Sequence, residues 1–139
     1  MSDEISVDWN DVATAGPGPF VRYVQGLRDG RLGFQRCIDC LDAVFYPRTI
    51  CPHCGGGRLT WYASAGVGAV YAASTVTVRS GQPYNVVLVD LDEGFRVMST
   101  VVDGGSEIAV GSRVVCDIRP AGAQDDIPVL RFRPLEVLQ

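Results

Sequence analysis

The sequence predicts a mainly β fold in which a short helix, a four-cysteine zinc ribbon and a five-stranded barrel follow one another. Two Cys-x-x-Cys pairs with ten residues between them predict the ribbon, because each pair can aim two thiolates at one metal ion. After residue 63 the chain changes to long runs rich in Val, Thr and Tyr, which predict strands. We therefore expect a flexible tail over residues 1–18, the helix and ribbon over residues 19–63, and the barrel domain over residues 64–139.

The helix is expected between Pro19 and Gly30. Proline suits the first helical turn, and glycine suits the position just past the last one. Between them, apolar residues recur at i, i+4 and i+7 on one helical face: Phe20, Val24 and Leu27. The preceding tail combines acidic and small residues with a Gly-Pro run, a composition typical of mobile termini.

The ribbon is built around the ligands Cys37, Cys40, Cys51 and Cys54. Four thiolates form a closed tetrahedral cage with no position for water, so we expect a structural Zn²⁺ and not a catalytic one. Iron is the alternative, because the same donor set suits it. Three short strands are expected to frame the cage: residues 32–36, 44–46 and 59–63.

Five strands without a long helix between them are expected after the ribbon: residues 67–79, 84–91, 95–102, 113–119 and 128–133. A long, curved first strand followed by four others fits a small closed barrel of the OB-fold type, with a small sandwich as the alternative. The run Val86–Val89 is apolar on both faces, so we expect its outer side to be covered by the helix, the ribbon or a partner subunit.

The charge distribution divides the chain into a basic and an acidic part. All basic residues are arginines, with six against three aspartates in residues 22–58 and six against nine carboxylates in residues 59–139. A basic front half suits a phosphate-bearing ligand or an acidic partner, although scattered surface charge would look the same. The acidic N-terminus lacks the basic start of a signal peptide, and no apolar run is long enough to span a membrane. We therefore expect a cytoplasmic protein with no membrane partner.

The sequence offers no catalytic set. Without lysine there is no phosphate-loop Lys and no Schiff base, and the single histidine, His53, lies between two metal ligands, where we expect it to point away from the metal. Cys116 shares a strand face with Val114 and Ile118, which indicates a core position. The acidic residues near Glu93 are expected to be solvated turn residues. The chain therefore does not look like a complete enzyme.

Nucleic-acid binding is an alternative function, because both ribbons and OB barrels bind nucleic acids. Such a protein needs a basic groove with aromatic platforms on the barrel. The barrel half of this chain is acidic, and its second strand is aliphatic. Binding of nucleic acid is therefore disfavoured but stays open.

The order of the motifs resembles one family. The motifs run from a short helix to the fourth barrel strand: Gly30-Arg31-Leu32, Gln35-Arg36-Cys37-x-x-Cys40, Phe45-Tyr46-Pro47-Arg48, Cys51-Pro52-x-Cys54-Gly55, a Gly-x-Val-Tyr strand, Pro83-Tyr84, Leu91-Asp92-Glu93-Gly94 and Val110-Gly111-x-Arg113-Val114. Over roughly residues 17–135, the chain resembles the acyl-CoA-associated zinc-ribbon plus OB-fold proteins, known as domain of unknown function 35. One departure is Leu41, which stands where that family usually has glycine.

The resemblance implies a non-catalytic accessory subunit, with two copies docked on the dimer of a thiolase-fold acyl-CoA enzyme, such as a thiolase or a thiolase-like aldolase. Such a subunit supports acyl-CoA binding, folding and activity of its partner. A coenzyme A ester shared with the enzyme would then meet the basic front half, and Arg36 and Arg48 are the hypothesised contacts to its phosphates. A stand-alone acyl-CoA-binding protein and a nucleic-acid-binding protein are the alternatives.

Overall fold

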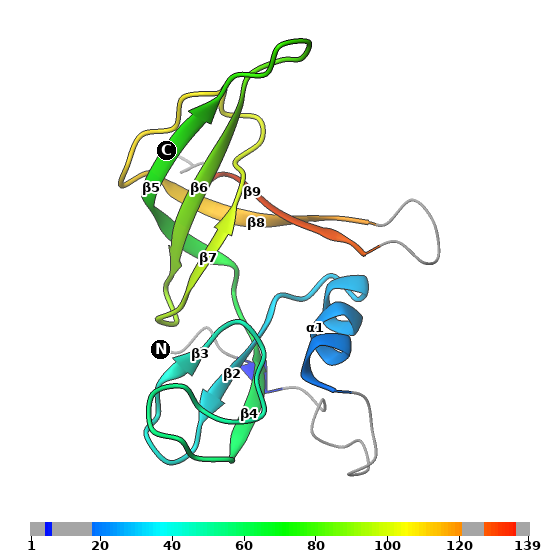
Figure 1. Cartoon of the computed structure of the whole chain (residues 1–139), viewed down its shortest axis with the longest axis vertical. Helices are drawn as coiled ribbons and strands as arrows, with labels where there is room; N and C mark the ends of the chain where they lie inside the picture. The colour runs from blue at the N-terminus through cyan, green and yellow to red at the C-terminus, as the bar shows by residue number, and fades with distance from the viewer. Residues whose placement is uncertain (1–4, 7–17, 121–126, 136–139) are drawn as a thin grey trace.

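The computed structural model describes residues 5–6, 18–120 and 127–135. They form a mainly β protein with one α-helix and two sheets, as predicted. Figure 1 shows the two sheets stacked along the long axis, with α1 (Pro19–Arg28) beside the smaller one. In this described part of the chain, no helix is long and apolar enough to cross a membrane.

The smaller sheet contains the ribbon. Its strands are antiparallel and lie in the order β1-β4-β2-β3. Their bounds are β1 Ile5–Ser6, β2 Gly33–Cys37, β3 Ala43–Val44 and β4 Leu59–Ala63. The first strand was not predicted: Ile5 and Ser6 pair with Ala63 and Tyr62, so the chain is part of the sheet at these two residues. The remainder of the predicted tail before residue 18 lies outside the described residues.

The larger sheet forms the barrel domain, in the order β7-β6-β5-β8-β9. The strands are β5 Val67–Val76, β6 Tyr84–Leu91, β7 Arg96–Ser99, β8 Arg113–Arg119 and β9 Val129–Pro134. A register shift between Val70 and Ala72 interrupts the β5–β6 ladder, as a bulge does when a strand bends. Gly68 is required nearby, because a Cβ there would collide with the carbonyl of Asp90.

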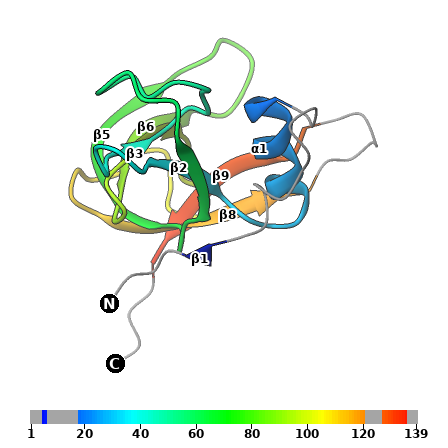
Figure 2. The same ribbon diagram turned by 90° about the horizontal axis from the view of Figure 1, so that it is seen from below.

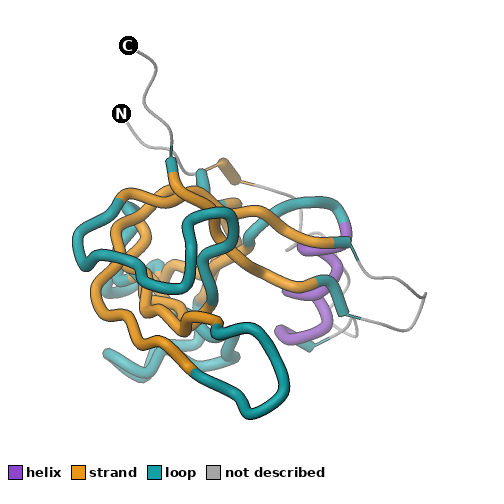
Figure 3. The backbone as a smooth tube through the Cα atoms, turned by 90° about the horizontal axis from the view of Figure 1, so that it is seen from above, coloured by secondary structure: helices purple, strands orange, loops and turns teal. Residues whose placement is uncertain are grey.

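The sheet is not the closed barrel predicted from the sequence, although the chain segments at its two edges, around β7 and β9, approach each other. Val101 and Phe132 form an isolated parallel bridge, and the Phe132 amide donates to the Thr100 carbonyl at 2.8 Å. Continuous strand pairing does not run around the sheet, so the barrel is of the partly open OB type. Figure 3 shows the strands curling round, with the helix to one side. Figure 1 places α1 beneath β8 and β9, and α1 overlaps these strands in Figure 2, which is seen from below.

The predicted cover over the outer side of β6 is incomplete. Val87 and Val89 point into the core and are buried, whereas Val86 and Leu88 are only half-buried on the other face. On the neighbouring strand, Met98 is paired with Leu88 and is 61% exposed. The described parts of the chain therefore leave this outer face partly open to solvent.

An aromatic stack joins the two sheets and the helix. Phe95, from the hairpin between β6 and β7, stacks on Phe34 of β2 with ring centroids 4.7 Å apart. It also stacks on Phe45 at 5.1 Å, and Phe45 meets Tyr23 of α1 edge-on at 5.4 Å. These rings belong to one core that continues from α1 through the ribbon into the barrel.

Phe95→Ala should destabilise the whole described domain, because it removes a buried ring from the stack that joins the two sheets. We expect a loss of about 3–5 kcal/mol in the free energy of unfolding, measured by urea titration. Met98→Ala is the matched control on the adjacent strand; as an exposed substitution it should change this free energy by about 0.5 kcal/mol or less. Equal losses for the two variants would contradict a shared core.

Candidate metal centre and the surrounding ribbon surface

The four predicted cysteine ligands converge on one point. Their sulfur atoms all lie within 4.8 Å of one another. The Sγ atoms of Cys37 and Cys54 are 3.6 Å apart, and those of Cys40 and Cys51 are 3.7 Å apart. A tetrahedral site with metal–sulfur bonds of about 2.3 Å has sulfur–sulfur edges of about 3.8 Å. The donor set and its spacing therefore fit Zn²⁺ held by four thiolates.

The two knuckles share one backbone design. The Leu41 amide donates to the Cys37 carbonyl at 2.8 Å, and the Gly55 amide donates to the Cys51 carbonyl at 2.9 Å. Both residues that close these turns have positive φ, 68° at Leu41 and 80° at Gly55. In the second knuckle, the amide of His53 donates to the Cys51 sulfur at 3.4 Å. Such bonds stabilise the thiolate form of the ligand.

The thiols differ in their tendency to ionise. Burial opposes ionisation of Cys51, but backbone amide donors and neighbouring thiols outweigh it and lower its pKa to about 7. At Cys40, a backbone hydrogen bond from Asp42 favours the thiolate, yet burial and neighbouring thiols raise the pKa to about 12. A bound dication therefore has to displace protons from the cage, and it replaces thiol–thiol contacts with metal bonds.

The remaining histidine and cysteine stay outside this cluster. His53 is exposed, and its Nδ1 lies 4.0 Å from the Asp42 carboxylate. Cys116 lies half-buried on β8 against the barrel core, where burial raises the pKa of its thiol. A Cβ at Gly66 would collide with the Cys116 sulfur, so the thiol fills space left by a glycine.

The two predicted phosphate contacts occupy different environments. The Arg36 guanidinium donates to the Leu41 carbonyl at 2.8 Å and to the Glu93 carbonyl at 3.2 Å. The Arg48 side chain is exposed, but its backbone amide and carbonyl are both bonded by the buried Gln35 side chain, at 2.7 and 2.8 Å. Because successive side chains of a strand point to opposite faces, Arg36 and the loop of Arg48 lie on opposite sides of β2.

The hairpin carboxylates are not simply solvated, which corrects the sequence interpretation. Glu93 accepts from the Ser64 hydroxyl at 2.7 Å and from the Ala65 amide at 2.8 Å, and so fastens the β6–β7 hairpin to the linker after β4. Asp90 and Asp92 each pair with an arginine, Arg96 at 2.6 Å and Arg113 at 2.7 Å. Gln35 and Glu93 were not singled out as functional from the sequence, because their partners are distant in the chain.

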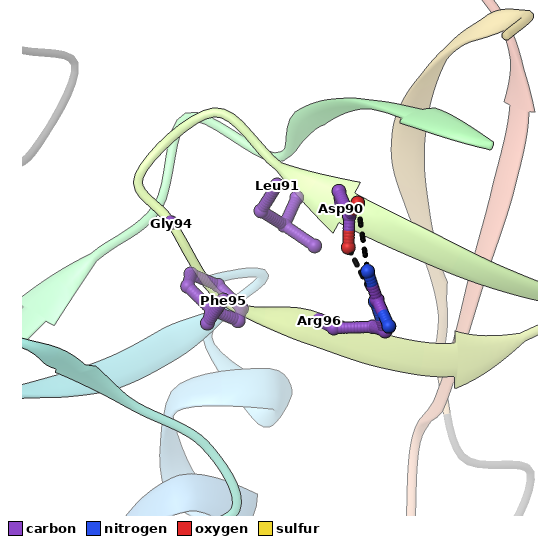
Figure 4. Close-up of a pocket in the computed structure, with 5 residues that line it drawn as sticks. All are labelled: Asp90, Leu91, Gly94, Phe95 and Arg96. Atoms are coloured by element: carbon purple, nitrogen blue, oxygen red, sulfur yellow. Dashed lines mark hydrogen bonds and ion pairs between the residues drawn. The ribbon is translucent and has the colours of Figure 1, made fainter. Parts of the chain in front are cut away.

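Two open hollows lie near these groups. One, of about 470 Å³, lies at the β6–β7 hairpin, and the Asp90–Arg96 ion pair forms part of its wall (Figure 4). The other, of about 450 Å³, lies between the start of α1 and the loop before the second knuckle. It combines an aromatic ring with a guanidinium and is lined by Pro19, Phe20, Pro47, Arg48, Thr49 and Ile50.

A four-thiolate ribbon followed by an OB barrel defines the class of zinc-ribbon–OB-fold proteins, and comparison with known families agrees. Residues 24–60 match the model described as "ChsH2, rubredoxin-like zinc ribbon domain", and residues 61–119 match "ChsH2, C-terminal OB-fold domain". The chain belongs to the domain of unknown function 35 (DUF35) family, as its motif order suggested.

Known relatives carry names of scaffolds and enzyme subunits. A "DUF35 domain-containing scaffold protein" of Methanocaldococcus jannaschii is 31% identical over 114 residues, covering 73% of this chain and 79% of the relative. A "Probable enoyl-CoA hydratase alpha subunit" of Thermomonospora curvata is 33% identical over 117 residues, covering 81% of this chain and 36% of the relative. The chain thus spans about a third of the length of that relative.

A solved structure titled "Ltp2-ChsH2(DUF35) aldolase" contains a chain with the same fold. The two chains are 30% identical, with a TM-score of 0.71, and the match covers 86% of this chain and 97% of that one. A match of this extent includes both the ribbon and the barrel.

Cys37→Ser should remove the metal, because a serine hydroxyl does not replace a thiolate in the cage. We expect zinc in the purified protein to fall from about one equivalent to well below half, together with a lower melting temperature, since the metal contributes folding free energy. Zinc is measured by mass spectrometry of the purified protein. Cys116→Ser is the matched control and should retain about one equivalent; zinc loss in both variants would contradict the assigned ligand set.

Gln35→Leu should loosen the Arg48 loop, because it leaves the Arg48 amide and carbonyl without their side-chain partner. We expect a loss of about 1–3 kcal/mol in unfolding free energy and faster amide exchange at Arg48. The readouts are chemical denaturation and hydrogen exchange. Gln82→Leu, in the exposed turn before β6, is the control and should leave both readouts unchanged; an unaltered Arg48 amide in the Gln35 variant would contradict the role given to Gln35.

Proposed function

We propose that this chain is a non-catalytic accessory subunit that docks on a thiolase-fold acyl-CoA enzyme, such as a thiolase or thiolase-like aldolase. The observation that carries the proposal is the likeness to the DUF35 chain of the Ltp2-ChsH2 aldolase, which extends over both the ribbon and the barrel. The names of other relatives, a scaffold protein and an enzyme subunit, support the same role.

The chemistry of the described residues also supports an accessory role. One ion held by the cysteine cluster would take all four thiolates and would have no open ligand position. His53 is exposed at a knuckle, and Cys116 fills a place beside Gly66. The catalytic groups of the proposed complex therefore belong to the enzyme subunit, and this chain supplies a surface and supports folding and acyl-CoA binding.

Nucleic-acid binding gains no support from the barrel. Three of its arginines are already neutralised within the chain, as Arg96 pairs with Asp90, Arg113 with Asp92 and Arg131 with Asp117. Arg96 also lies over the Tyr71 ring at 3.6 Å, so that this exposed aromatic ring already has a partner on one face. These pairs compete with the phosphate and base contacts that a single strand would need.

The proposal is tested by co-expressing the tagged chain with a thiolase-fold enzyme encoded in the same genome. We expect a stable complex with two copies on an enzyme dimer, measured by light scattering after gel filtration, and higher acyl-CoA turnover than the enzyme alone shows. Nucleic acid recovered with steep salt dependence, or acyl-CoA bound without any enzyme, would replace the proposal with one of the alternatives.

Coenzyme A contact is proposed mainly at Arg48. Arg48 is exposed, and it lines the hollow next to α1 together with Phe20, which is 57% exposed. A ring and a guanidinium are suited to an adenine and its phosphates. Arg36 remains the second proposed contact, but its substitution would also remove the bonds to Leu41 and Glu93.

In the reconstituted complex, Arg48→Ala should raise the KM for the acyl-CoA ester by about three- to tenfold, because one charge-assisted hydrogen bond to phosphate is lost. The kcat should change little, since the reacting groups lie on the enzyme. Arg79→Ala, an exposed arginine of the barrel, is the matched control. Identical KM values for the two variants would remove Arg48 from the proposal.

A further inference from the structure

The first knuckle holds a leucine in a conformation that favours glycine. Leu41 has φ of 68°, in the left-handed region that a residue with a Cβ adopts only at an energetic cost. The second knuckle makes the same turn, closed by the same kind of hydrogen bond, and places Gly55 at the equivalent position with φ of 80°. The backbone is therefore strained at Leu41 in the first knuckle, whereas glycine avoids this strain at the equivalent position of the second.

The Leu41 side chain makes little apolar contact within its own chain that could offset this strain. Leu41 is 66% exposed, and Ile38 in the same knuckle is 51% exposed. The described core clusters include neither residue. A strained backbone that presents an apolar side chain to solvent is unfavourable for the isolated protein. We therefore infer that the side chain contacts another molecule.

The two carboxylates around this apolar pair, Asp39 and Asp42, face partners within the chain. Asp39, between Ile38 and Cys40, forms an ion pair with Arg58. Asp42 faces the ring of His53 at 4.0 Å. Exposed apolar residues surrounded by polar groups that already have partners are typical of the centre of an interface. Such a surface does not require a charged group from the partner.

The backbone of the knuckle is held in place before any partner arrives. The Leu41 amide is bonded to the Cys37 carbonyl, and the Leu41 carbonyl is bonded by the Arg36 guanidinium at 2.8 Å. The same guanidinium reaches the Glu93 carbonyl in the barrel hairpin at 3.2 Å. A projecting side chain on a fixed backbone loses little conformational entropy when it docks.

We propose that Leu41, with Ile38 beside it, is the anchor by which the first knuckle inserts into an uncharged, apolar recess on the partner enzyme. The inference rests on the proposed function and specifies which surface of this chain makes the contact. It also gives the reason for leucine at a position where glycine would relieve the backbone.

The test uses the reconstituted complex with the thiolase-fold enzyme. Leu41→Gly keeps the turn and relieves its strain, so the melting temperature and the zinc content of the free chain should be equal to or higher than those of the wild type. Its affinity for the enzyme, measured by calorimetry, should fall by about tenfold or more, as for loss of a central apolar anchor. Leu41→Met, which keeps an apolar side chain, should bind within about threefold of the wild type.

Two further variants complete the design. Ile38→Ser should also weaken binding, whereas Val110→Ala should not, although Val110 is similarly exposed at 67% in a loop of the barrel domain. If Leu41→Gly bound the enzyme with wild-type affinity, Leu41 would not be the anchor, but the proposed function would still hold. Lower stability or lost zinc in Leu41→Gly would also overturn the anchor, because the leucine would then serve its own chain. A wild-type chain that does not bind the enzyme would overturn the proposed function and the anchor together.

A second copy of this chain is the remaining occupant to test. Light scattering of the free wild-type chain should give the monomer mass. A dimer that Leu41→Gly dissociates would overturn the assignment of the anchor to the enzyme.

Discussion

Phe95 is the residue on which the arrangement of the two sheets depends. It follows the turn of the β6–β7 hairpin, yet the residue is only 6% exposed because its ring is stacked against Phe34 of the ribbon and Phe45 of the loop after β3. Neither sheet alone is large enough to bury much apolar surface. The stack gives both of them, and α1 through Tyr23, one continuous core.

Polar contacts around the stack fix its orientation. The Glu93 carboxylate accepts from Ser64 and from the Ala65 amide, and the Arg36 guanidinium donates to the Glu93 carbonyl. Stacked rings alone tolerate sliding and rotation, whereas directed hydrogen bonds do not. These bonds hold the hairpin in a defined orientation on the ribbon.

The parts that were predictable from sequence are those determined by local spacing. Four cysteines in two knuckles predict the cage, because each turn brings its own pair of sulfurs together. Strands β4, β6 and β8 begin and end where their apolar pattern and turn residues indicate. The family followed from motif order, which is itself a matter of spacing.

The parts that were missed depend on contacts between distant residues. Gln35 bonds Arg48 across 13 positions, and Glu93 bonds Ser64 across 29, so neither partner is visible in the local sequence. The hairpin acids look like solvated turn residues until the neighbouring strands supply their arginines. Ile5 and Ser6 join the ribbon sheet through backbone pairing with β4, which composition alone does not reveal.

The guanidinium of Arg36 connects the first knuckle to the barrel, because it donates hydrogen bonds to the carbonyls of both Leu41 and Glu93. Cys37 and Cys40 lie in the chain between Arg36 and Leu41, so opening of the cage would displace the Leu41 carbonyl from the Arg36 guanidinium. A shift of the Arg36 guanidinium would then weaken its bond to Glu93 in the β6–β7 hairpin, which also carries Phe95 of the aromatic stack. Opening of the metal cage is therefore expected to affect the barrel as well as the ribbon.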